Sequence, residues 1–188
     1  ADLAEGNYMN IDQDRKVVHI DCPQDKIIIR LNSELNKTYL WFGSKEARES
    51  YSENQIAQDR NALSVGGGGG FSGGRGQTKA SALYRNAGRD LIDTLEEDSE
   101  ILSKLTQDQL PKEMQGMSAA QRTAYVNKMA QKRAEIKQQI GQLSREREAF
   151  VVNKRKEMAA DSGADTLGDV IGSAVRKQLQ SSGFEFRN

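Results

Sequence analysis

A run of glycines divides this chain of 188 residues into two parts. Gly66 to Gly70 are followed by Gly73, Gly74 and Gly76. Glycine loses more backbone entropy on folding than any other residue, so a tract of this kind is typical of a flexible linker. The preceding segment is polar, and a helix in it would need support from elsewhere. We therefore expect three parts: an N-terminal segment over 1–43, a polar segment and linker over 44–76, and a helical part over 77–188.

The same tract also invites a phosphate-loop interpretation, which its residues do not support. A P-loop carries lysine and then serine or threonine directly after its last glycine. Here Gly76 is followed by Gln77 and Thr78, and no buried strand precedes the tract. The single arginine at Arg75 makes the tract a weak match to arginine–glycine RNA-binding segments. A linker explains the tract better.

The balance of charges and apolar residues excludes several classes of protein. Twenty-seven basic and 27 acidic side chains give a net charge of zero, so non-specific binding to nucleic acid is not expected. Leucine, isoleucine, valine and phenylalanine make up about one fifth of the chain, which predicts a small core and a large solvated surface. No run of 18 apolar residues is present, so we predict no membrane-spanning segment.

The chain has one cysteine, Cys22, and one histidine, His19. These numbers exclude an intrachain disulfide, a cysteine-based zinc site and a site with several histidines. A helix start next to Cys22 would lower its pKa, but a nucleophile also needs a base, and only His19 is close in sequence. The many carboxylates lie on polar runs, where we expect solvated faces. We predict no catalytic, cofactor-binding or metal-binding residue in this chain, and no enzyme.

The N-terminal segment predicts short β elements and one helix. Residues 7–12 alternate in polarity like a strand, and residues 17–20 form a second β-like run. Pro23 suits the first turn of a helix, and apolar residues then recur at helical spacing to about residue 36, at Ile27, Ile28, Leu31 and Leu35. The aromatic residues Trp41 and Phe42 lie in an extended edge segment that ends at Gly43. They form either a packing surface or a partner-binding patch.

The helical part contains one long helix and a shorter last one. Ser118 and Gln121 have the form of a capping box, which predicts a helix over about 118–160. An apolar stripe at intervals of seven follows, at Met129, Ile136, Leu143 and Phe150. Polar residues occupy the second seam position of a coiled coil, so an intramolecular packing face is favoured over a partner surface. A last amphipathic helix is expected over about 166–181, closed by Gly183.

Several motifs resemble a bacterial group of von Willebrand factor A-type (VWA) proteins. Residues 3–14 (LAEGNYMNIDQD) are similar to the last strand of such a domain, and residues 31–39 (LNSELNKTY) to its terminal helix. The charged helical extension of the group resembles residues 90–93, 110–118, 124–126 and 143–151. The longer glycine tract and Cys22 depart from the pattern of the group.

The resemblance implies a fold and a role. It implies that 1–43 is the last strand and helix of an α/β domain whose main part lies upstream. On that interpretation Ile27, Ile28, Leu31 and Leu35 lack the sheet that they would cover. The upstream domain can hold Mg²⁺ through an Asp-x-Ser-x-Ser motif, but this chain contains no such motif, so no metal residue is assigned here. The resemblance further implies a bacterial, periplasmic or secreted protein.

We therefore expect a mostly α chain: a short β/α remnant, a glycine-rich linker and a helical extension with one long helix. The predicted function is non-enzymatic protein–protein binding or adhesion, as the C-terminal part of a VWA protein with an unknown protein partner. The start at Ala1 without methionine fits a processed chain or a fragment. The alternative is a free-standing helical scaffold or coiled-coil adaptor.

Overall fold

The computed structural model describes residues 20–66, 73–162 and 167–184, and these residues are mostly helical. They contain no β-strand, only an isolated antiparallel bridge between Trp41 and Asp90. The expected strand over 7–12 lies outside the described residues. The elements are α1 (Pro23–Asn36), α2 (Lys45–Gly66), α3 (Gly74–Ala80), α4 (Leu91–Leu95), α5 (Ile101–Lys104), η2 (Gln107–Gln109), η3 (Lys112–Met114), α6 (Ala119–Ser162) and α7 (Leu167–Ser181).

The chain divides into two compact units, and the larger one contains most of the described residues. This helical unit comprises Asp21–Phe150, and the other comprises Ala1–Ile20 with Val151–Asn188. The helical unit joins residues from both sides of the glycine tract. Its composition therefore differs from the expected division at residues 43 and 76. Among the described helices, none is both long enough and apolar enough to cross a membrane.

Helix α1 begins where its sequence predicts, at Pro23, and buries one apolar face. Ile28, Leu31 and Leu35 are buried, whereas Ile27 is 40% exposed and lies outside that face. They pack with Tyr39 and with Ile136 and Ile140 of α6, forming the α1–α6 cluster. The expectation that these residues lack a covering layer is therefore wrong, because α6 covers them instead of a sheet.

A second apolar cluster, the α4–α6 cluster, is built around the short helices. It consists of Leu40, Leu91, Ile92, Leu110, Met114 and Val126. The extended segment after α1 brings Leu40 to it, because the amide of Leu91 donates to the carbonyl of Leu40 (3.0 Å) and that of Phe42 to Arg89 (3.0 Å). Gly43, at φ = +111°, then turns the chain into α2, as its position after the aromatic run predicts.

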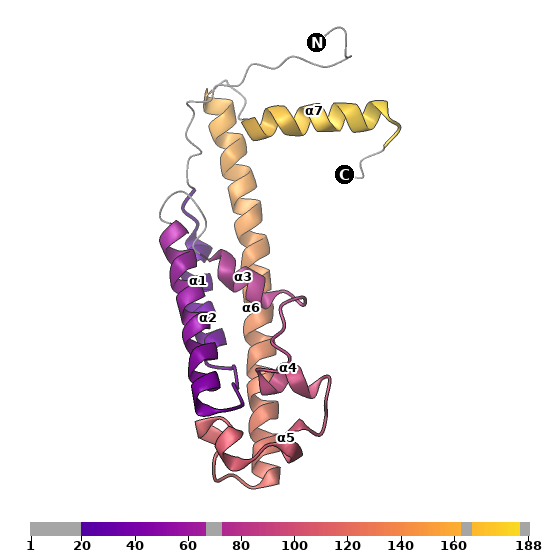
Figure 1. Cartoon of the computed structure of the whole chain (residues 1–188). Helices are drawn as coiled ribbons and strands as arrows, with labels where there is room; N and C mark the ends of the chain where they lie inside the picture. The colour runs from indigo at the N-terminus through magenta and orange to yellow at the C-terminus, as the bar shows by residue number, and fades with distance from the viewer. Residues whose placement is uncertain (1–19, 67–72, 163–166, 185–188) are drawn as a thin grey trace. The chain divides into compact units, whose positions relative to one another are not determined.

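The last two glycines of the tract belong to a helix. Gly74 and Gly76 lie in α3, which Figure 1 shows between the α1–α2 pair and α6. A Cβ atom on Gly76 would come within 3.3 Å of both Asn32 Cβ and Ile28 Cγ2. Glycine is needed here because it allows α3 to approach α1 closely. The prediction of a linker through Gly76 is wrong for this part of the tract, and residues 67–72 lie outside the described residues.

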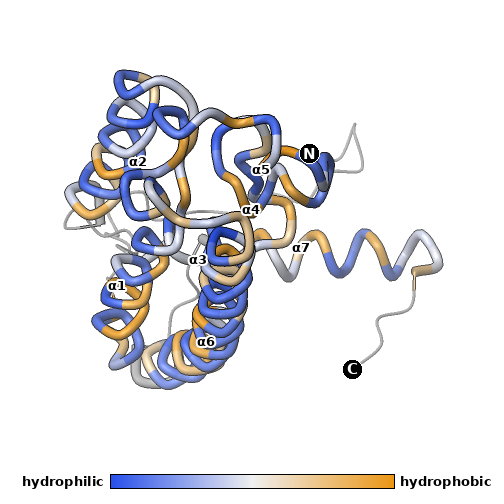
Figure 2. Tube along the Cα trace, turned by 90° about the horizontal axis from the view of Figure 1, so that it is seen from below, coloured by the Kyte–Doolittle hydropathy of each residue, from blue (hydrophilic) through white to orange (hydrophobic). Residues whose placement is uncertain are grey.

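Helix α6 confirms the long helix expected after Ser118. The amide of Gln121 donates to Ser118 Oγ (3.3 Å), and the amide of Ser118 donates to Gln121 Oε1 (2.9 Å), which is the predicted capping box. Figure 2 shows hydrophilic residues over most of α6 with apolar residues at intervals, in agreement with a narrow apolar stripe.

Replacing Ser118 with alanine should lower the free energy of unfolding by about 1 kcal/mol, because it leaves the amide of Gln121 without its acceptor. Urea unfolding followed by circular dichroism measures this loss. The matched control is Ser99→Ala, at an exposed serine outside a helix cap, which should change stability by less than about 0.5 kcal/mol. Equal effects of the two substitutions would contradict the capping role.

Helix α7 ends in the motif that Gly183 predicts. Gly183 has φ = +85°, its amide donates to the carbonyl of Gln180 (3.1 Å), and the amide of Phe184 donates to Leu179 (3.0 Å). These two bonds are the Schellman pattern of a glycine-terminated helix. Ile171 and Val175 on α7 are about half exposed.

Candidate functional site

Two clusters of buried charged residues organise the helical unit. The arginine cluster consists of Arg133, Asp90, Asp93 and Thr38, and the lysine cluster of Lys79, Asp59, Asn36, Asn32 and Gln55. Buried charges are costly unless they are paired and hydrogen-bonded. The hydrogen bonds of each cluster therefore show which polar groups are already paired within the protein and which could still bind a ligand.

The arginine cluster uses every donor of its guanidinium. Arg133 Nη1 donates to Asp90 Oδ2 (2.7 Å) and Asp93 Oδ1 (3.1 Å), and Nη2 to Asp90 Oδ1 (2.9 Å) and the Thr38 carbonyl (2.7 Å). Nε donates to Thr38 Oγ1 (3.2 Å), which completes the five N–H groups of an arginine. The ring of Tyr39 covers the guanidinium at 4.2 Å. No donor is left for a ligand, so this cluster holds α6, α4 and the end of α1 together.

Asp90 is the centre of that cluster and also starts a helix. Its side chain is fully buried, caps α4 by accepting from the amide of Asp93 (3.1 Å), and accepts from the amide of Leu40 (2.6 Å). Hydrogen bonds to both oxygens offset the cost of burying this carboxylate. At position 133 the packing of α6 thus depends on this polar network, between the apolar residues of its stripe.

The lysine cluster fixes α2 and α3 on α1. Lys79 is fully buried, and its Nζ donates to Asp59 Oδ2 (2.8 Å) and Asn36 Oδ1 (2.6 Å). Asp59 Oδ2 also accepts from the side-chain amides of Asn32 (3.0 Å) and Asn36 (2.7 Å). Gln55 and Asp59 are the buried residues in the part of α2 whose side chains are described, and both make polar contacts there. Ile56 and Leu63 of this helix remain about half exposed.

Burial lowers the pKa of Lys79 to about 8, although its hydrogen bond to Asp59 acts in the opposite direction. The amine lies behind Asp59 without access to solvent, so it cannot act as a nucleophile toward a substrate. Burial also raises the pKa of Cys22, and the nearby carboxylate of Asp25 raises it further. Both effects oppose the lowering of the Cys22 pKa that a helix start would cause, and His19 lies outside the described residues.

Raising the pH from 7.5 to 9.5 should stabilise the protein through Lys79 by about 2 kcal/mol. Its pKa is about 8 in the folded protein and 10.5 in an unperturbed lysine, so the unfolded chain binds more protons between these values. The free energy of unfolding therefore rises with pH across this interval, and the contribution of Lys79 is constant below it because both states are then protonated. Urea unfolding at the two pH values should show this rise in the wild type and in Lys128→Met, an exposed control, but not in Lys79→Met. An unchanged rise in Lys79→Met would contradict the assignment.

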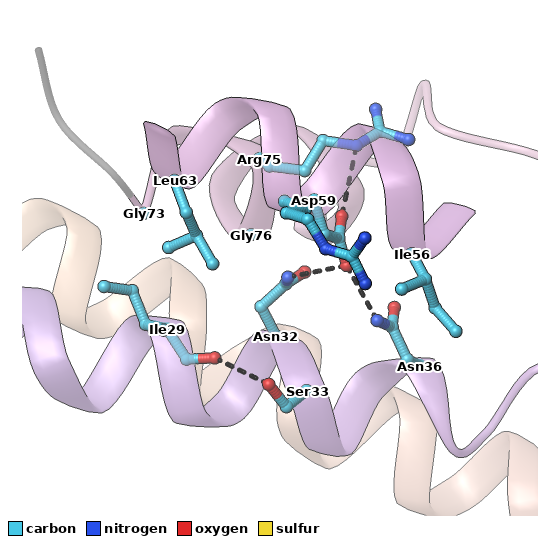
Figure 3. Close-up of a pocket in the computed structure, with 11 residues that line it drawn as sticks. Ile29, Asn32, Ser33, Asn36, Ile56, Asp59, Leu63, Gly73, Arg75 and Gly76 are labelled. Atoms are coloured by element: carbon cyan, nitrogen blue, oxygen red, sulfur yellow. Dashed lines mark hydrogen bonds and ion pairs between the residues drawn. The ribbon is translucent and has the colours of Figure 1, made fainter. Parts of the chain in front are cut away.

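A groove of about 410 Å³ lies beside the lysine cluster, between α1, α2 and α3. Figure 3 shows Leu63 and Ile29 at one end and Ile56 with Asn36 at the other, with Asn32 and Asp59 between them. Asn32 Oδ1 is buried there and accepts no hydrogen bond from the described residues. The groove therefore has apolar side chains at both ends and polar ones in the middle.

Two arginines give the groove its charge. Among the described lining residues Asp59 is the one acid, and Lys79 neutralises it. Arg75 lies 3.4 Å from Asp59 Oδ1 and also bonds to Gln58 and to the Tyr84 hydroxyl. Arg60 is exposed and makes no hydrogen bond or ion pair within the described part of the chain. The groove thus presents a net positive charge with one unpaired guanidinium.

Five of the six residues that the sequence predicts as a packing or partner surface belong to, or pack against, the two apolar clusters of the helical unit. Trp41 stacks on Tyr39 (5.0 Å) beside the α1–α6 cluster, which also contains Ile136 and contacts Leu143. Phe42 and Met129 pack on the α4–α6 cluster, and Phe150 is half-buried.

Sequence reasoning missed the charged residues of both clusters. Arg133 lies four residues after Met129 and three before Ile136, on the same face of α6, and a charge that is buried on such a face needs a paired partner. Asp90 and Asp93 precede and open a short helix, as a capping aspartate would. Lys79 and Asp59 carry no comparable signal.

The described residues contain no group of three or more histidine, cysteine or acidic side chains that could hold a metal ion. No protein-family model, no curated protein and no solved structure matches this chain.

Proposed function

We propose that this chain is a non-enzymatic protein-binding module, in which the helical unit is the scaffold and the groove between α1 and α2 is the contact surface. The observation that carries the proposal is the exposure of Ile56 (47%) and Leu63 (42%) at the groove, opposite Ile29. Exposed apolar side chains around a groove are typical of a protein contact. The saturated arginine cluster and the enclosed Lys79 support a structural role for the buried charges.

The resemblance to VWA proteins adds a proposal about the parent protein, namely that this module is the C-terminal part of such a chain. This proposal rests on the sequence resemblance; the segments that carry it include residues 31–39, 110–118 and 124–126, which belong to one compact unit. The coding sequence upstream of Ala1 tests this proposal. An open frame with Asp-x-Ser-x-Ser is expected, and a start codon directly before Ala1 would refute it.

The alternative of a free-standing helical scaffold is favoured by one observation. The apolar face of α1 is covered by α6, so the unit needs no upstream sheet to bury it. Both versions bind a protein, and they differ in whether the unit depends on an upstream domain. If urea unfolding of this chain alone has the same midpoint as in the longer protein, the scaffold is independent.

Site-specific photocross-linking tests the binding function in the cells that produce the protein. A photoreactive phenylalanine at position 56 should give a cross-linked adduct with another protein, whereas the same group at exposed position 128 should not. Cross-links at position 175 of α7 but not at 56 would keep the binding function and refute the groove as its surface. The absence of adducts at positions 56 and 175 would contradict the proposed function.

A further inference from the structure

We infer that the groove between α1 and α2 binds an acidic amphipathic helix of a partner protein. This inference rests on the proposed function and names the chemistry of the partner. The occupant would carry two apolar side chains about two turns apart and a carboxylate between them. Each of these features follows from the side chains that the groove presents.

The apolar requirement comes from the spacing along α2. Ile56 and Leu63 are seven residues apart, so they lie on one face of the helix about 10 Å apart along its axis. Ile29 of α1 lies across from Leu63 (Figure 3). A helix lying along the groove would place apolar side chains against these two positions, as helices do in grooves of other binding domains.

The carboxylate requirement comes from Arg60. It lies one turn from both Ile56 and Leu63, on the same face of α2, and its guanidinium has no partner within the described residues. Among the described lining residues the one acid is Asp59, which is neutralised by Lys79 at 2.8 Å and accepts from two asparagine amides, so it does not offset this charge. A carboxylate is the complement of an unpaired guanidinium, and a lysine at the same place would be repelled by Arg60 and Arg75.

Fluorescence anisotropy with three labelled helical peptides and the full chain tests the inference. The acidic probe has two leucines seven residues apart with a glutamate between them. The basic probe has lysine in place of the glutamate, and the polar probe has serines in place of the leucines. The wild type should bind the acidic probe saturably, at least tenfold more tightly than either of the others, and more weakly at 300 mM than at 50 mM salt.

Arg60→Glu should weaken binding of the acidic probe at least tenfold and strengthen binding of the basic probe. The second effect shows that the variant is folded. Arg145→Glu, at an exposed arginine of α6, is the matched control and should bind like the wild type. Ile56→Ser/Leu63→Ser should weaken binding of both charged probes.

Three outcomes would overturn the inference: equal binding of the acidic and basic probes, an unchanged preference in Arg60→Glu, or no saturable binding of the acidic probe. If any of these occurs while photocross-linking at position 56 or 175 still captures a protein, the binding function stands and the partner chemistry is wrong. If photocross-linking also fails, both proposals fall.

Discussion

Replacing Arg133 with methionine should lower the free energy of unfolding by about 4 kcal/mol. The arginine is 4% exposed and pairs with a fully buried Asp90. Methionine fills a similar volume but leaves the Asp90 carboxylate in the interior without its counter-charge. The Thr38 carbonyl also loses its donor. Urea unfolding followed by circular dichroism at 222 nm measures the change.

Two further variants separate charge from packing at this site. Arg133→Met/Asp90→Asn should be more stable than Arg133→Met alone, because a neutral amide can still accept from the amide of Leu40 and buries no charge. Arg155→Met, at an exposed arginine of α6, should change stability by less than about 0.5 kcal/mol. A loss below about 1 kcal/mol for Arg133→Met would contradict the buried cluster.

Replacing Ile140 with alanine should cost about 3 kcal/mol. Its side chain is fully buried in the α1–α6 cluster, against residues that lie more than a hundred positions earlier in the chain. Removing three carbon atoms loses their transfer free energy and leaves a cavity that the two helices close only in part. Chemical unfolding measures the loss, and Leu83→Ala, at a leucine that is 94% exposed, is the control with little expected effect.

The same substitution, Ile140→Ala, tests whether α1 packs on α6. If α1 packs on α6, Ile140→Ala should speed amide hydrogen exchange in α1, at residues such as Leu31 and Leu35. The amides of α7, which belongs to the other unit, should exchange as in the wild type. Unchanged exchange in α1 would mean that this helix is stabilised by a layer other than α6.

Much of the secondary structure could be predicted because its signals are local. Helices expected over about 24–36, 118–160 and 166–181 are observed at Pro23–Asn36, Ala119–Ser162 and Leu167–Ser181. Their ends depend on residues within one turn, such as Pro23, the Ser118–Gln121 box and Gly183.

The candidate site was not predictable in the same way. The groove needs α1 and α2 side by side, and nothing local in the polar sequence of α2 indicates which face is buried. The structure buries Gln55 and Asp59 there and leaves Ile56 and Leu63 half exposed. From hydrophobicity alone, Ile56 and Leu63 would be assigned to the buried face of α2 and Gln55 and Asp59 to the exposed face. Such an assignment takes no account of the polar partners that Asn36 and Lys79 supply.

The sequence by itself therefore determined the mostly helical character, the approximate ends of α1, α6 and α7 and the narrow stripe of α6. Tertiary structure alone decided that α1 packs on α6, that Gly76 allows close contact between helices, and that Arg133 and Lys79 are buried with their acids. The physical reason is separation along the chain. Arg133 meets Thr38 across 95 residues and Asp90 across 43, and a buried charge is stable only where the fold brings its partners to it.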